Sequence, residues 1–178
     1  MDNVNKKQFV PYFVFAGLAF LGLMFVLFFN MYSILTLLQI GTRDFEYYAT
    51  FFHVVGGGLG DLEDGLLIQI AFIGLLITYF VRFVLFLLSG LCKANVIKNE
   101  KLLLGLSKAN KTCSIIFFII DAIMALILLI NGFVQLGPVA GGLGLLEDFY
   151  FFGVSLASMI GALKLNRSVV TAAQPKAE

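Results

Sequence analysis

The chain has 178 residues, of which 60% are hydrophobic and 13% are charged, and its mean hydropathy is +0.98. Soluble domains are about 45–50% apolar, so this composition excludes a protein that has only water as its solvent. The formal net charge of +1 gives no strong overall field, which excludes nucleic acid as a partner recruited by net charge.

Four apolar stretches follow one another along the chain and predict four transmembrane helices. The first spans about residues 9–31, with a more polar extension to 40, and the second spans 66–91. The third spans 113–134, and the fourth, which is short, spans 149–165. Each is close to the ~20 residues that a helix needs to cross about 30 Å of hydrocarbon. The sequence lacks the alternation of barrel strands, so we predict an all-α membrane protein: an up-down bundle of four helices in a single domain, 1–178.

The basic residues lie mostly on one side of the predicted helices. Ten of the twelve lysines and arginines fall before the first helix, in the connection 92–112, or at and after the end of the fourth helix. Cytosolic segments carry such an excess, so we predict that both termini, the basic loop 92–112 and the tail 166–178 are cytosolic. The outer loops are then 41–65 and 135–148, and they hold seven of the eleven acidic residues.

Each outer loop ends with the same motif, directly before a helix. Residues 57–64 read GGLGDLED and residues 141–148 read GGLGLLED, identical at seven of eight positions. Two helical hairpins of common design, arranged as parallel repeats, would produce this pattern. The glycines of the two predicted turns are Gly57, Gly58, Gly60, Gly141, Gly142 and Gly144.

The acidic residues of the two motifs have two interpretations. These residues are Asp61, Glu63, Asp64, Glu147 and Asp148. In one interpretation they only stabilise the first turn of a helix, where exposed N–H groups and the helix dipole favour negative charge. In the other they form an outer acidic vestibule that concentrates cations. The motif does not have the spacing of an EF-hand loop, so we predict no metal site.

Residues 54–61 resemble the glycine-rich filter and following aspartate of two-pore-domain potassium channels, a family with the same two-hairpin topology. The resemblance implies a pore loop in the first outer connection. It does not extend to the second outer loop, which is too short for a pore helix, and neither loop has a GYG-type filter. We therefore assign the chain to no family from its sequence.

Two charged residues lie inside predicted helices, Arg82 in the second and Asp121 in the third. Counted from Lys93 and Lys111 at ~1.5 Å per residue, both lie about 15 Å from the same cytosolic boundary. A charge at the centre of a bilayer costs roughly 2.5–3.5 kcal/mol on insertion scales, so we predict that the two side chains face inward and form an ion pair. The functional alternative is an ion or proton path through the bundle.

Small residues recur every fourth position in the fourth helix, at Gly153, Ala157 and Gly161. Ridges of this type let helix backbones approach closely, so this face is predicted to pack against another helix. The other helix belongs either to the same bundle or to a partner subunit.

The functional prediction is mainly one of assembly. The chain lacks the HExxH, GxSxG, GxxxxGK[ST] and CxxC motifs of common enzymes, so we expect no enzymatic activity and no cofactor. We expect a multi-pass integral membrane subunit or scaffold, whose partners are the lipid bilayer and other membrane subunits or copies of itself. The alternative is a cation channel or small transporter that uses Arg82, Asp121 and the acidic outer loops.

Overall fold

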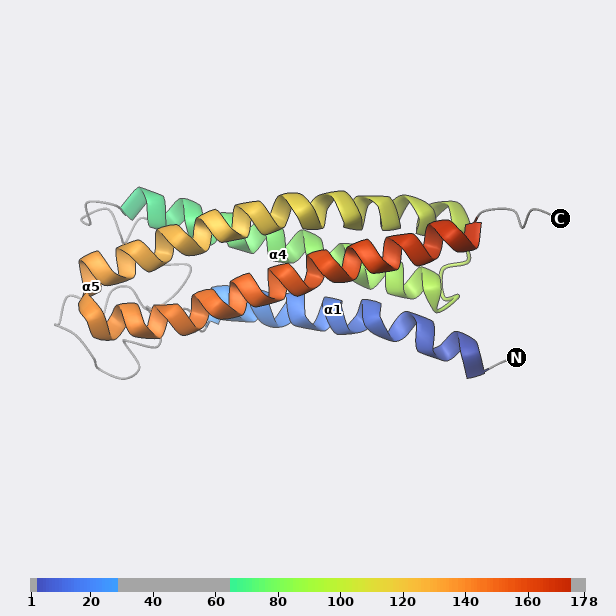
Figure 1. Ribbon diagram of the computed structural model, residues 1–178, viewed down its shortest axis with the longest axis horizontal. Helices are drawn as coiled ribbons and strands as arrows, with labels where there is room; N and C mark the ends of the chain where they lie inside the picture. The colour runs from blue at the N-terminus through green and yellow to red at the C-terminus, as the bar shows by residue number, and fades with distance from the viewer. Residues whose placement is uncertain (1–2, 29–64, 174–178) are drawn as a thin grey trace.

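The computed structural model describes residues 3–28 and 65–173 (Figure 1). These residues form three helices, α1 (Asn3–Phe28), α4 (Gly65–Lys93) and α5 (Glu100–Ala173), and the described part of the chain contains no strand. The predicted all-helical fold class is therefore confirmed for this part. Everything predicted for residues 29–64 lies outside the described residues, including the first outer loop and its Gly-rich acidic motif.

Helix α5 folds back on itself, so that its two limbs lie side by side (Figure 1). The Ser107 hydroxyl donates to the Asn166 side chain, and the rings of Phe118 and Phe152 lie 5.3 Å apart between centroids. In each pair the two residues are equally far along the chain from a point at 135–137. The helix therefore turns back near this point, beside Gly137 and Pro138. Proline has no backbone N–H for the helical ladder, which makes this the natural place for the helix to bend. We call the parts before and after Pro138 the first and second limbs.

Four segments of these helices are long and apolar enough to cross a membrane. They are Gln8–Leu27 in α1, Leu66–Lys93 in α4, and Glu100–Ile130 and Asp148–Ala172 in the two limbs of α5. Large apolar side chains cover much of their outer surface, and examples are Ile77, Phe80, Ile119 and Leu126, each more than half exposed. An apolar surface of this extent suits lipid and not water, which indicates a multi-pass membrane protein.

The connection between α4 and α5 is shorter than the loop 92–112 predicted from the sequence. Helix α5 already begins at Glu100, and the Asn99 side chain accepts a hydrogen bond of 2.9 Å from the backbone N–H of Leu102, as a helix N-cap does. Hydropathy marks where a helix crosses hydrocarbon, and it does not mark where the helix begins. The second limb likewise continues beyond the predicted 165, to Ala173.

The four segments pack into one elongated body with two different ends (Figure 1). We call the end at which α4 joins α5 the connection end and the opposite end, where α5 turns back, the fold-back end. The described parts of the chain begin and finish at the connection end, because α1 starts there and the second limb ends there. Which end faces the cytosol stays a prediction, as do the up-down order across a membrane and the two parallel repeats.

Aromatic and small side chains bring α1 close to the other helices. The Tyr150 hydroxyl of the second limb donates to the Leu18 carbonyl of α1, at 3.1 Å. A side chain added at Gly22 would overlap the ring of Tyr79 in α4, so glycine permits this close approach. Because α1 packs against both α4 and α5, the interior is shared by all four segments.

Candidate functional site

The two charges predicted to lie inside the membrane meet in the interior of the bundle. Arg82 projects from α4 and Asp121 from the first limb of α5, and Arg82 Nη2 lies 2.8 Å from Asp121 Oδ2. Their side chains are 1% and 0% exposed. The ion pair is therefore sealed from both lipid and water.

Two hydroxyl groups complete the surroundings of the Asp121 carboxylate. Ser155, from the second limb, donates to Asp121 Oδ2 at 2.7 Å and accepts a hydrogen bond of 2.9 Å from Arg82 Nη2. Thr78 lies one turn before Arg82 on the same face of α4, and its hydroxyl donates to Asp121 Oδ1 at 2.5 Å. Both carboxylate oxygens thus have donors, and three helical segments are joined at one point.

The rest of the Arg82 guanidinium lies against aromatic rings. Its Cζ is 4.9 Å from the centroid of the Tyr79 ring and 5.7 Å from that of Phe117. Nε and Nη1 are buried and have no hydrogen-bond acceptor among the described residues. The faces of aromatic rings attract cations, so these contacts offset part of the cost of burying the charge. Tyr79 is held in turn by a hydrogen bond of 2.8 Å from its hydroxyl to the Phe151 carbonyl.

This cluster connects α4 to both limbs of α5 through buried side-chain contacts. A buried ion pair adds little net stability by itself, but removing one partner leaves an uncompensated charge, at a cost of about 3–5 kcal/mol. The closed geometry holds α4 and both limbs of α5 in one register. Transport of an ion or proton through Arg82 and Asp121 would first require the bonds to Thr78 and Ser155 to open.

A second set of polar contacts lies nearer the connection end. The Asn110 amide donates to Ser89 Oγ at 2.8 Å and to the Leu85 carbonyl at 3.2 Å, linking the first limb to α4. Ser107 and Asn166 link the two limbs through a hydrogen bond of 3.1 Å. Buried polar side chains therefore extend from the Arg82 cluster toward the connection end.

The structure places Asp148 differently from the outer acidic vestibule that its sequence motif suggested. Helix α5 continues through 141–148, and Asp148 falls on the inward stripe that also contains Phe151 and Ser155. It is only 9% exposed, and its Oδ2 has no partner among the described residues. It lies beside a cavity of about 240 Å³ between the two limbs, lined otherwise by apolar side chains such as Ala125 and Phe149.

The other residues of the second acidic motif are part of the same helix. Gly141, Gly142 and Gly144 lie within α5, and a side chain added at Gly142 would meet no neighbour within 4 Å. Glu147 is also helical, and its side chain lies outside the described part. The predicted meeting of the two acidic motifs involves residues outside the described part of the chain, so it stays a prediction. Asp61, Glu63 and Asp64, with Gly57, Gly58 and Gly60, lie in 29–64, outside those residues.

The predicted ridge of small residues is divided between two surfaces. Gly161 is buried, and a side chain added there would overlap the ring of Phe15 in α1. Gly153 is exposed and has no atom within 4 Å of an added Cβ, and Ala157 is exposed as well. The ridge thus packs inside the bundle at one end and faces outward at the other.

Sequence reasoning identified Arg82 and Asp121 but not the hydroxyl groups around them. Thr78 had a usable signal, because it lies four positions before Arg82 and so on the same helix face. Ser155 had none, because its register relative to Asp121 is set by the fold-back of α5. Serine and threonine are also common in membrane helices, where they often bond their own backbone.

Among the residues that the structure describes, no three His, Cys, Asp or Glu side chains gather where they could hold a metal ion. Comparison with known protein families, with characterised proteins and with solved structures finds no match to this chain.

Proposed function

We propose that this chain is a non-catalytic membrane subunit or scaffold, which assembles with other membrane subunits or with copies of itself. The observation that carries the proposal is the outward part of the small-residue ridge, Gly153 and Ala157, which no described residue covers. Helix association in lipid depends on close packing, because lipid tails are as apolar as the side chains. Exposed small residues on a membrane helix support such packing.

The surroundings of this patch suit a helix–helix interface. Phe149, Phe152 and Ile160 lie beside it and are 69%, 41% and 43% exposed. A partner helix would rest on the backbone at Gly153 and Ala157 and be flanked by these larger side chains. Arg82 and Asp121 are paired inside the bundle, so a partner helix would meet the outer faces.

We further infer an up-down bundle of two parallel hairpins, with both termini and the connection 94–99 in the cytosol. Lys93, Lys98 and Lys101 support this orientation, since they gather at the connection end, where α1 also starts. The excess of acidic residues in 41–65 supports placing the other end outside.

The proposal is tested by measuring the mass of the native complex after gentle extraction. We expect an oligomer or a complex with unlike proteins, and we expect Gly153→Leu to reduce it because the leucine separates the two backbones. Gly17→Leu is the matched control, since Gly17 in α1 is also exposed and has no atom within 4 Å of an added Cβ. A monomeric mass for the unmodified protein would overturn the proposal.

A cation channel or small transporter is the second candidate function. It is favoured by the buried polar side chains that extend from Asp121 through Asn110 toward the connection end. On this proposal, purified protein in liposomes conducts cations, and Asp121→Asn abolishes the flux while the mass of the complex is unchanged. Flux that persists in the variant would exclude Asp121 as a conduction element.

A further inference from the structure

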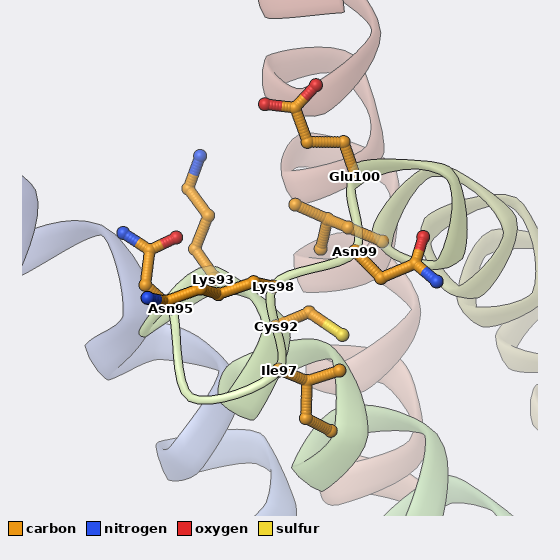
Figure 2. A pocket seen from close by; sticks show the side chains of 8 residues that line it. Cys92, Lys93, Asn95, Ile97, Lys98, Asn99 and Glu100 are labelled. Atoms are coloured by element: carbon orange, nitrogen blue, oxygen red, sulfur yellow. The ribbon is translucent and has the colours of Figure 1, made fainter.

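A polar hollow of about 470 Å³ lies where α4 joins α5 (Figure 2). Its polar lining comes from the last residue of α4, the short connection and the first residue of α5. These side chains are Lys93, Asn95, Lys98, Asn99 and Glu100. Figure 2 shows Lys93, Asn95 and Lys98 on one side of the connecting segment, with Asn99 pointing the other way.

The hollow carries an excess of positive charge. Within the described part of the chain the only ion pair joins Arg82 and Asp121, so neither Lys93 nor Lys98 has a carboxylate partner there. Glu100 is the one carboxylate in the lining. The first turn of α5 adds the partial positive charge of a helix N-terminus. The electrostatics of this hollow therefore favour an anionic group.

The backbone of the connection is closely wound and is hydrogen-bonded to the end of α4. Ala94 N–H donates to the Gly90 carbonyl at 2.8 Å, and Val96 N–H donates to the Leu91 carbonyl at 3.0 Å. Asn95 has a φ of 60°, in the left-handed region where asparagine is favoured among non-glycine residues. The two lysines thus flank a closely wound turn, with Lys93 at the end of α4 and Lys98 directly after the turn.

An apolar hollow of about 330 Å³ adjoins the polar one. The two share Lys93, Glu100 and Leu103, and the second adds Lys101 together with Leu104, Val169 and Ala172. Lys93 is also the last residue of the candidate membrane span Leu66–Lys93. A charged compartment beside an apolar one, at the end of a membrane span, is what a phospholipid requires for its headgroup and acyl chain.

We propose that the two hollows together bind one anionic phospholipid, with its phosphate among Lys93, Lys98 and Lys101 and an acyl chain along Leu104 and Val169. This proposal rests on the membrane location given under the proposed function, but it does not depend on assembly. Phosphate is the group recognised, and the apolar hollow selects a lipid over a soluble phosphate ester.

The test is native mass spectrometry of the full chain in detergent, with dioleoyl phosphatidic acid or dioleoyl phosphatidylcholine added. The three lysines together, opposed in part by Glu100, are expected to make the phosphatidic acid bind at least about tenfold more tightly than the phosphatidylcholine. Lys93→Gln/Lys98→Gln/Lys101→Gln is expected to remove this preference. The matched control changes three lysines that line neither hollow, Lys108, Lys111 and Lys164, to glutamine.

Two further measurements sharpen the test. Glu100→Gln removes the competing carboxylate, so it is expected to raise the affinity for phosphatidic acid. Soluble glycerol 3-phosphate at equal concentration is expected not to displace the lipid. Equal loss of preference in the control triple variant, or displacement by glycerol 3-phosphate, would overturn the proposed lipid site. The same spectra report the oligomeric mass, so a failure of this proposal is distinguished from a failure of the assembly proposal.

Discussion

The interior of this protein differs between its two ends. Toward the connection end, from the Arg82 cluster onward, the core contains many hydroxyl, amide and charged groups: Thr78, Arg82, Ser89, Ser107, Asn110, Ser114, Asp121, Ser155 and Ser158. Among the described side chains toward the fold-back end the core is mostly apolar, as at Leu23, Val26, Ile68, Phe72, Leu75, Leu128 and Phe151, with Asp148 as the exception.

The difference indicates that apolar packing and polar contacts have different roles in one bundle. Apolar packing at the fold-back end depends on shape, because lipid could cover the same side chains at similar cost. Hydrogen bonds and the ion pair at the other end specify which faces meet, since a wrong register leaves polar groups without partners in a low-dielectric interior. We therefore expect the polar groups to determine register, whereas apolar packing, which also occurs toward the connection end at Tyr12, Ala16 and Phe86, adds contact area.

The largest effect is expected from breaking the ion pair. Asp121→Leu or Arg82→Leu alone leaves one buried charge without its partner and should destabilise the fold by about 3–5 kcal/mol. The double variant Arg82→Leu/Asp121→Leu should be less damaging than either single change, because no charge remains unpaired. Denaturant unfolding in detergent measures all three. A double variant as unstable as the sum of the singles would contradict pairing.

The apolar half is tested by truncating one buried side chain. Leu75 is fully buried in α4, so Leu75→Ala should cost about 2–5 kcal/mol through lost contacts and a new cavity. Ile77 lies in the same helix but is 54% exposed, and Ile77→Ala should change stability much less. Thermal unfolding of the two variants in the same detergent gives the comparison. Equal losses would mean that Leu75 does not face a packed core.

A smaller effect separates the two surfaces of the small-residue ridge. Gly161→Ala forces a methyl group against Phe15 and should cost about 1–3 kcal/mol by overpacking. Gly153→Ala meets open space in the described bundle, so the stability of the monomer should be unchanged or slightly higher. Unfolding midpoints in a detergent that dissociates any complex measure both changes. The predicted order is reversed if Gly153 is the buried position.

The smallest effect is expected from a single neutral hydrogen bond in the polar half. Asn110→Ala, Ser89→Ala and the double variant form a cycle that isolates the 2.8 Å contact between these side chains. Interhelical hydrogen bonds in membranes average about 0.6 kcal/mol, and the coupling energy should be of that size. A coupling near zero would indicate that the polar half determines register through the ion pair alone.

Some of this arrangement was predictable from the sequence. The four apolar stretches predicted a helix within each of the four candidate spans, although two of these spans also include 100–112 and 166–172, which were predicted as cytosolic loop and tail. Counting residues from the lysines placed Arg82 and Asp121 at one depth, and the cost of an isolated charge predicted that they would face each other. Both inferences depend on properties of single segments.

The remaining features depend on how the helices rotate and align. Asp148 was predicted in a turn on the outer side of the membrane, directly before a helix, yet it lies inside α5 and its side chain is buried. The sequence did not predict that Gly161 is buried in the bundle while Gly153 is exposed. The spacing of small residues shows that they share a helix face, but it does not show which part of that face a neighbouring helix covers. The contacts of Ser155 required the register between two limbs of α5, which only the folded structure supplies.

The buried ion pair has a consequence for the order in which the chain enters a bilayer during synthesis. Arg82 emerges thirty-nine residues before its partner Asp121. If α4 entered alone, an unpaired arginine would lie within the hydrocarbon, at a cost of roughly 2.5–3.5 kcal/mol on insertion scales. Entry of α4 together with the first limb of α5, as one hairpin, avoids this cost because the two charges neutralise each other on the way in. The same pair that holds the finished bundle in register therefore favours delaying the membrane insertion of α4 until Asp121 has been synthesised.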